Sequence, residues 1–322
     1  MAAGDDVEEL VALARAGRPR GIARLLTIVE NDPGRARTVA RLLAGDAGRA
    51  RVVGLTGPPG VGKSTSTSAL VGALRARGQT VAVLAVDPSS PFSGGALLGD
   101  RIRMGEHASD AGVYIRSLAS RGRLGGLAAA VPQSLRVLDA AGFDVVLVET
   151  VGVGQAEVEI ASLADTVLVL LAPGLGDAVQ AAKAGILEVS DVYVVNKADR
   201  EGADVLAREL RQTLAMAHDH DPAVWRAPIV KTVAARGEGV GDLLAALDAH
   251  AGFLARGDGA GLAARRTARA AAEVEALVLG AVHARLGDLH GPEALPRVAA
   301  QVAAGTTDPY TAADQLLGAV AG

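Results

Sequence analysis

One run of eight residues has the types and spacing that bind a nucleotide polyphosphate. It fits the pattern G-x-x-x-x-G-K-[ST] at every fixed position and consists of Gly57, Pro58, Pro59, Gly60, Val61, Gly62, Lys63 and Ser64. Glycines let such a loop wrap closely enough for backbone N–H groups to face phosphate oxygens. We expect Lys63 to reach the β- and γ-phosphates and the Ser64 hydroxyl to bind Mg²⁺, and Thr65 completes the predicted loop site.

The flanking residues predict that this loop joins a strand to a helix. Residues 51–56 are typical of a buried strand, and residues 64–77 of a helix that ends at Gly78. The N–H groups and positive dipole end at the start of a helix add to the attraction for phosphate. An ordinary glycine turn is the competing interpretation, and the strand and helix in register argue against it.

A second motif, Asn196-Lys197-Ala198-Asp199, follows the apolar residues 192–195. The Asp199 carboxylate can accept from the ring N–H and the exocyclic amine of guanine, while the Lys197 stem can lie over base and sugar. Adenine offers no matching pair of donors, so a buried carboxylate would lose its partners. The motif therefore predicts GTP rather than ATP, with a loop leading into a helix as the alternative. Backbone amides around Ala234 can lie near the guanine oxygen.

Carboxylates follow two other predicted strands. Glu149 suits an outer-sphere position around Mg²⁺, and the amide of Gly152 can sense the γ-phosphate. Asp87 can hold Mg²⁺ through water or orient the attacking water, and Asp100 can join it when the intervening loop closes. A capped turn and a flexible surface loop are the competing interpretations. The predicted catalytic residues are Lys63, Asp87 and Glu149, and the predicted metal site consists of Ser64, Asp87, Asp100 and Glu149.

The elements that must position these residues form an α/β pattern. Seven short apolar segments alternate with predicted helices, at residues 52–55, 80–86, 113–117, 143–148, 166–171, 192–195 and 229–232. Most are rich in Val and Leu without alternation, which suits strands covered on both faces. We therefore predict a doubly wound, mainly parallel sheet, in which ligands bind beyond the carboxyl ends of the strands.

The chain divides by composition into three predicted parts. These are a helical N-terminal extension (1–48), a P-loop domain (49–256) and a helical C-terminal element (257–322) that begins with the glycine-rich residues 256–261. Helices without a catalytic motif suggest packing or oligomerisation, and we favour dimerisation for the last part. The basic residues near 264–266 are interpreted as a solvated helix face.

Composition excludes several classes of protein. The chain has 322 residues, 50% of them hydrophobic, so it can bury a full-sized core. A formal net charge of −4 without a basic run predicts no nucleic-acid or membrane partner. The absence of cysteine rules out disulfides and thiolate metal sites, so the expected metal is Mg²⁺. No signal peptide or run of about 20 apolar residues is present, and we expect a cytoplasmic protein.

The sequence closely resembles the MeaB/ArgK-type family of methylmalonyl-CoA mutase-associated GTPases. The matching stretches are GPPGVGKST from Gly57, VDPSSPFSGGALLGDRIRM from Val86, IRSLASRG from Ile115, VETVGVGQAE from Val148, VLVLLAPGLGDAVQAAKAGI from Val167 and VNKAD from Val195. They span nearly the whole predicted α/β domain. Together they are far more specific than a phosphate-binding loop alone.

The resemblance implies a homodimeric GTPase that uses GTP to chaperone an adenosylcobalamin-dependent methylmalonyl-CoA mutase, gating cofactor delivery and protecting the mutase. It implies that Lys63 and Ser64 serve phosphates and Mg²⁺, that Asp87, Asp100 and Glu149 form a metal-and-switch set, and that Asn196, Lys197 and Asp199 read guanine. The loop with Asp177, Gln180 and Lys183 resembles an additional switch. No glutamine directly follows Gly152, so we hypothesise slow intrinsic hydrolysis that mutase binding accelerates.

Three other functions are open at this point. The partner can be a different cobalamin-dependent acyl-CoA mutase, because substrate choice belongs to the mutase. A transport-linked ATP kinase is disfavoured by the guanine motif, and a metallochaperone GTPase by the lack of cysteine.

Overall fold

The computed structural model describes residues 6–46, 48–87, 105–107, 109–119, 130–150, 156–174, 186–217, 224–290 and 294–318. The chain forms two compact units, Met1–Arg269 and Ala270–Gly322. The three-part division expected from composition, with boundaries after residues 48 and 256, stays a prediction.

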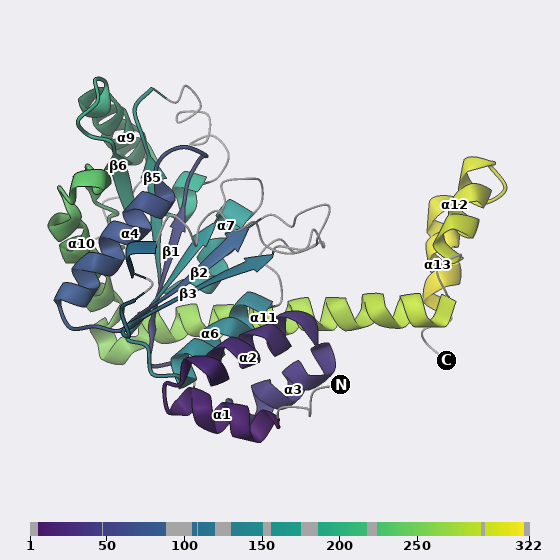
Figure 1. Cartoon of the computed structure of the whole chain (residues 1–322). Helices are drawn as coiled ribbons and strands as arrows, with labels where there is room; N and C mark the ends of the chain where they lie inside the picture. Colours follow the sequence, from purple (N-terminus) through teal and green to yellow (C-terminus); the bar gives the residue numbers. More distant parts are fainter. Residues whose placement is uncertain are drawn as a thin grey trace. The chain divides into compact units, whose positions relative to one another are not determined.

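A parallel sheet is the centre of the first unit (Figure 1). Its strands are β1 (Arg51–Thr56), β2 (Val81–Asp87), β3 (Val113–Ala119), β4 (Val145–Thr150), β5 (Thr166–Leu171), β6 (Val192–Asn196) and β7 (Ile229–Thr232). They lie in the order β3-β2-β4-β1-β5-β6-β7, and every pairing is parallel. Each strand begins and ends within two residues of its predicted range. The predicted doubly wound α/β fold is therefore confirmed.

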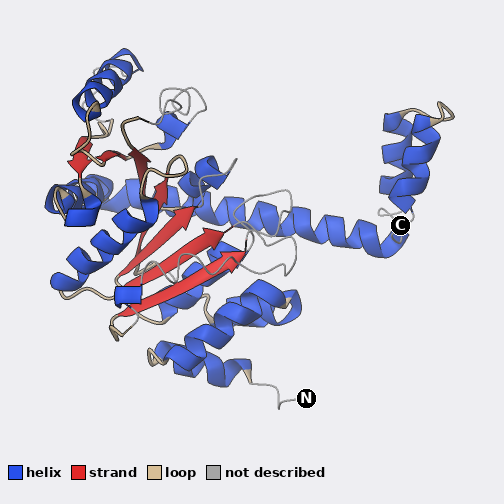
Figure 2. Cartoon of the chain, turned by 45° about the horizontal axis from the view of Figure 1, so that its top comes forward, coloured by secondary structure: helices blue, strands red, loops and turns tan. Residues whose placement is uncertain are grey.

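Helices cover both faces of the sheet (Figure 2). One face packs against α4 (Lys63–Ala76) and α10 (Val240–Leu254), and the other against α6 (Ala130–Ala140), α7 (Ala156–Leu163) and α9 (Ala203–Ala217). Neighbouring residues of β1 contribute to different faces, since Val52 joins one buried cluster and Val53 the other. Burial on both sides explains why these strands lack an alternating pattern.

The N-terminal helices pack as a group against α6. They are α1 (Val7–Arg15), α2 (Pro19–Asn31) and α3 (Pro33–Leu42). The carboxylates of Asp6 and Asp32 accept backbone N–H groups at the starts of α1 and α3, and prolines occupy the first turns of α2 and α3. The predicted helical extension is therefore present, and its apolar side belongs to the core.

Three short 3₁₀ helices also occur among the described residues. They are η1 (Gly105–His107), η2 (Ile186–Val189) and η3 (Ala234–Arg236). The last of them follows β7 and lies in the segment predicted to contact a base.

The C-terminal part of the described chain is helical, with α11 (Arg256–His290), α12 (Ala294–Ala303) and α13 (Pro309–Gly318). The predicted glycine-rich linker forms a break within α11, because Gly257, Asp258 and Gly259 have φ values of +58°, +60° and +80°. Among the described residues, no helix combines the length and apolar character needed to cross a bilayer.

Two buried aspartates lie at the amino edge of the sheet. Asp165 precedes β5 and Asp191 precedes β6, and they are only 3% and 4% exposed. Asp165 accepts the backbone N–H of Val52 at 3.0 Å, and Asp191 accepts that of Val167 at 2.8 Å. Each carboxylate thus links its own strand to a neighbouring one by a charge-assisted hydrogen bond.

Three arginines of α11 also pair with these aspartates. The guanidinium of Arg265 binds Asp191 through two nitrogens, at 2.8 and 2.6 Å, while Arg266 and Arg269 lie 3.4 and 3.5 Å from Asp165. The interpretation of residues 264–266 as a solvated helix face was wrong. It failed because the negative partners come from strand starts that are distant in sequence.

Replacing Asp191 with alanine is expected to lower the free energy of unfolding by about 3 kcal/mol, since Val167 N–H and Arg265 would lose a buried acceptor. Chemical denaturation followed by circular dichroism measures this change. The matched control is Asp248→Ala, because Asp248 also pairs with two arginines, Arg51 and Arg77, but is 54% exposed. That control should lower the free energy of unfolding by less than about 1 kcal/mol. Equal losses in both variants would contradict the stabilising role of the buried Asp191 contacts.

Candidate functional site

The predicted phosphate-binding loop runs from the end of β1 to the start of α4. Gly57 and Gly62 have φ values of +142° and +95°, which side chains rarely allow. A Cβ at Gly57 would overlap the carbonyl oxygen of Leu170, and one at Gly62 would overlap the amide nitrogen of Asn196. Within the described residues, no side chain caps α4, whose N-cap is Gly62 of the loop. The start of a helix in this arrangement is a common anion site.

Lys63 begins α4 and is buried. Its ammonium donates to the carbonyl oxygens of Gly57 at 2.7 Å and Pro58 at 3.1 Å. The positive charge is therefore held against the loop itself. The expectation that Lys63 serves phosphates bound by the loop stays a prediction.

The structure brings Ser64 and Glu149 together, while their shared role toward Mg²⁺ stays a prediction. The Ser64 hydroxyl donates to Oε1 of Glu149 at 2.7 Å, and the carboxylate, near the end of β4, is only 2% exposed. The other oxygen, Oε2, accepts from the hydroxyl of Thr67 at 2.9 Å. Parallel pairing of β1 with β4 places Leu55 opposite Glu149, which brings this carboxylate beside the loop.

Asn196, at the end of β6, connects the loop to the second motif. Its Nδ2 donates to the Val61 carbonyl at 2.8 Å, while its Oδ1 accepts from the Thr232 hydroxyl and from the Ala234 amide, both at 3.1 Å. The residue is only 3% exposed. One buried side chain therefore fixes three segments that lie far apart in the sequence.

Lys197 and Asp199 lie at the exposed side of this region. Lys197 has a left-handed φ of +56°, and its ammonium donates to the Gly60 carbonyl at 2.6 Å. The Asp199 carboxylate pairs with the guanidinium of Arg236 at 3.3 Å. A hydrogen bond from Arg236 to Glu238, assisted by the charges of Glu238 and Asp199, raises the pKa of Arg236.

The structure places Ala234 in this region, although its amide donates to Asn196. Its contact with guanine therefore stays a prediction.

Some predicted residues cannot be placed in this way. Asp100 and Gly152 lie outside the described residues, as do Asp177, Gln180 and Lys183 of the proposed additional switch. Asp87 ends β2, so its backbone lies at the same carboxyl edge as the loop, but its side chain is not among the described parts. The roles assigned to these residues stay predictions.

Two side chains of this region were missed by the sequence analysis. Thr67 is fully buried beside Glu149, and Arg236 pairs with Asp199. The polar run Ser64-Thr65-Ser66-Thr67-Ser68 at the start of an otherwise apolar helix was a signal for the first. No sequence signal separates Arg236 from the chain's other arginines.

The oxygen donors of Ser64 and Glu149 suit Mg²⁺, which prefers carboxylate, hydroxyl and water oxygens. Within the described residues, no group of three or more His, Cys, Asp or Glu side chains forms a metal cage. Mg²⁺ in nucleotide sites is commonly held by one or two protein oxygens together with phosphates, so the residues present fit this ion.

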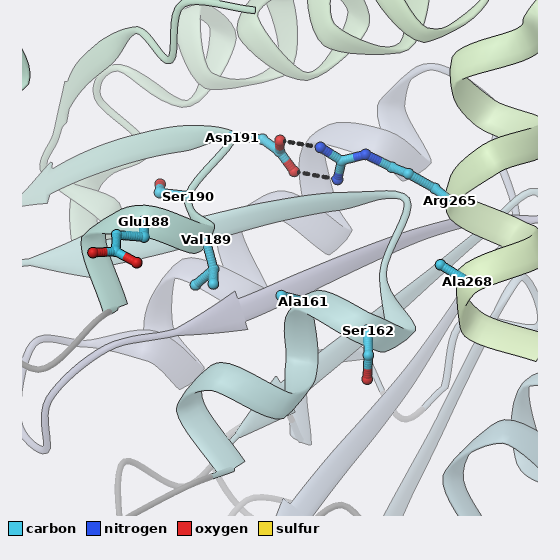
Figure 3. A pocket seen from close by; sticks show the side chains of 8 residues that line it. All are labelled: Ala161, Ser162, Glu188, Val189, Ser190, Asp191, Arg265 and Ala268. Atoms are coloured by element: carbon cyan, nitrogen blue, oxygen red, sulfur yellow. Dashed lines mark hydrogen bonds and ion pairs between the residues drawn. The ribbon is translucent and has the colours of Figure 1, made fainter. Parts of the chain in front are cut away.

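A pocket of about 220 Å³ lies elsewhere, beside the amino end of β6 (Figure 3). Its lining includes Asp191 and Arg265, whose two hydrogen bonds cross one side, together with Ser162 of α7 and Glu188 of η2. The charges of Asp191 and Arg265 already neutralise each other. We therefore assign this pocket to the contact between Asp191 and Arg265 of α11, and not to the predicted nucleotide site.

The sequence is similar to those of known GTPases. A family model for the methylmalonyl Co-A mutase-associated GTPase MeaB matches residues 22–289. A Pyrococcus abyssi protein with the provisional name of a GTPase is 44% identical over 317 residues, covering 98% of this chain and 97% of that protein. The mitochondrial methylmalonic aciduria type A homolog of Mus musculus is 40% identical over 194 residues, which cover 59% of this chain and 46% of the Mus musculus protein.

A solved structure is also similar over its full length. The crystal structure of an LAO/AO transport system kinase aligns with a TM-score of 0.71 and 25% sequence identity, and the alignment covers 100% of both chains.

Changing Asn196 to Asp is expected to weaken GDP binding by about tenfold or more, the factor that 1.4 kcal/mol represents. The change replaces the donor to Val61 with an oxygen that repels the carbonyl. Isothermal titration calorimetry measures the affinity. Asn31→Asp is the matched control, because Asn31 also donates its Nδ2 to a carbonyl, that of Thr27, but at an exposed position of α2. Equal GDP affinities for Asn196→Asp and the unmodified chain would contradict the conclusion that Asn196 holds the loop and residues 232–234 together.

Proposed function

The chain belongs to the family of methylmalonyl-CoA mutase-associated GTPases, and on that premise we propose that it hydrolyses GTP to GDP and phosphate as a chaperone of a cobalamin-dependent mutase. We propose adenosylcobalamin-dependent methylmalonyl-CoA mutase as the partner, with GTP hydrolysis coupled to cofactor delivery and mutase protection. The family's name and the Mus musculus relative's name support this choice.

The Asn196 contacts are the observation that carries the guanine-nucleotide proposal. They hold the loop that faces phosphates at a fixed position relative to the segment that ends in Asp199. A base bound at Asp199 and phosphates bound at Gly57–Ser64 would then belong to one nucleotide. Guanine satisfies both oxygens of the Asp199 carboxylate, whereas adenine does not.

In the proposed mechanism, Lys63 and the N–H groups of the loop bind and orient the phosphates. Ser64 would ligate Mg²⁺ directly, and Glu149 would hold it through water. Mg²⁺, when bound, neutralises charge on the β- and γ-phosphates. Positioning and charge stabilisation are the main protein contributions to phosphoryl transfer, so no covalent step on the chain is required.

We propose that Asp87, Asp100 and Gly152 form the parts of the site that respond to the γ-phosphate. Asp87 would orient the attacking water, and the mutase would accelerate hydrolysis by completing this arrangement. The absence of a glutamine after Gly152 supports slow turnover by the chain alone.

We also propose that the C-terminal helices form a homodimer contact. Val274, Val278 and Val282 follow one another at four-residue spacing on α11 and are 60%, 55% and 38% exposed. Residues at this spacing share one helix face. Such an apolar stripe favours a protein contact over exposure to water.

The double variant Val274→Glu/Val278→Glu is therefore expected to be monomeric, because two charges would be desolvated in the contact. Size-exclusion chromatography with light scattering gives the mass. Val205→Glu on α9, where the valine is also half exposed, should leave the dimer intact. A monomeric unmodified chain, or a dimeric double variant, would contradict this contact.

The test of the proposed function is nucleotide turnover with GTP or ATP, in the presence and absence of methylmalonyl-CoA mutase from the same source. We expect slow hydrolysis of GTP only, rising about tenfold or more with the mutase. GTP hydrolysis that ignores this mutase would direct the search to other cobalamin-dependent acyl-CoA mutases. Preferential ATP turnover would overturn the guanine assignment and favour a transport-linked kinase.

Asp199→Asn sharpens that test. An amide replaces one acceptor by a donor, so GTP turnover should fall about a hundredfold or more, while xanthosine triphosphate, which presents a carbonyl in place of the amine, becomes the better substrate. Asp204→Asn is the control, because Asp204 is an exposed aspartate that pairs with Lys231. It should leave the preference for GTP unchanged.

A further inference from the structure

Hydroxyl groups from one helix hold both oxygens of the Glu149 carboxylate. Ser64 contacts Oε1 at 2.7 Å, and Thr67 contacts Oε2 at 2.9 Å. The two hydroxyls are three positions apart on α4, so they lie on the same face of the helix. Ser64 belongs to the predicted phosphate and Mg²⁺ site, whereas Thr67 was assigned no role.

The Thr67 hydroxyl has one proton and two acceptors within reach. The Lys63 carbonyl oxygen lies at 3.0 Å, and Oε2 of Glu149 lies at 2.9 Å. Oε2 of Glu149 is the nearer of the two acceptors, and we assign the proton to it. Thr67 is 0% exposed, and a lost donor there is not replaced by bulk water.

We propose that Thr67 is a positioning residue for Mg²⁺, acting through Glu149. The inference rests on the proposed function and assigns a role within the same site. The hydrogen bond from Thr67 to Oε2 fixes the plane of the Glu149 carboxylate and leaves Oε1 turned toward Ser64. On that side, Oε1 would accept a hydrogen bond from a water bound to the ion. Residues that orient metal-binding groups in this way commonly change metal affinity by ten- to a hundredfold when altered.

The test is a Mg²⁺ titration of the full chain, followed by the fluorescence of a ribose-labelled GDP analogue. Thr67→Val removes the hydroxyl but keeps the branched shape, and Thr67→Ser restores a hydroxyl. Ser66→Ala is the matched control, because Ser66 is buried on the same helix with no hydrogen-bond partner for its hydroxyl among the described residues. Thermal melting without nucleotide or Mg²⁺ reports on folding alone.

We expect Thr67→Val to raise the Mg²⁺ concentration for half-maximal binding about tenfold. Its GDP affinity in EDTA should stay within about twofold of the unmodified chain, as should all values for Thr67→Ser and Ser66→Ala. An unchanged Mg²⁺ midpoint, or equal weakening with and without Mg²⁺, would make Thr67 a packing residue only and overturn the proposal.

If Thr67→Val does not fold, Thr67→Ala, which favours a helix, replaces it under the same two criteria. Failure of the unmodified chain to bind labelled GDP would instead overturn the proposed function. The two failures are thereby distinguished.

Discussion

The buried amide of Asn196 is the interaction on which the proposed nucleotide site depends. It extends from the end of β6, donates to the phosphate-binding loop, and accepts from the segment that contains Thr232 and Ala234. A buried amide left without these partners would be costly, so the three segments are fixed together or not at all. Gly62 lies against this amide, and any residue with a Cβ at that position would displace it.

The polar side chains at the two edges of the sheet make different kinds of contact. At the carboxyl edge, Glu149 and Asn196 emerge beside the loop after β1, as expected for parallel strands. At the amino edge, Asp165 and Asp191 bind backbone amides of neighbouring strands and arginines of α11. Asp139 adds to this edge by accepting the amides of residues 49 and 50. The charges that stabilise the fold are therefore kept away from those proposed to bind nucleotide.

Much of this arrangement was predictable from local sequence. Short apolar segments, most of them rich in Val and Leu, indicated every strand. The two motifs indicated the loop and Asn196, because their residue types are required by the backbone and by chemistry. Arg265 and Thr67 were not predictable in the same way. An arginine on an alanine-rich helix, or a threonine in the polar run that begins α4, acquires its role from a carboxylate that only the tertiary structure brings near. The same holds for the Ala234 amide, whose acceptor lies 38 residues away.

The most direct test of the central claim is a crystal structure of the chain with GDP and Mg²⁺. We predict that the diphosphate lies in the loop Gly57–Ser64, with the Lys63 ammonium on phosphate oxygen in place of the Gly57 and Pro58 carbonyls. We also predict that guanine contacts the Asp199 carboxylate while Asn196 keeps its bonds. A diphosphate outside the loop, or a base that makes no contact with residues 196–199, would contradict the central claim.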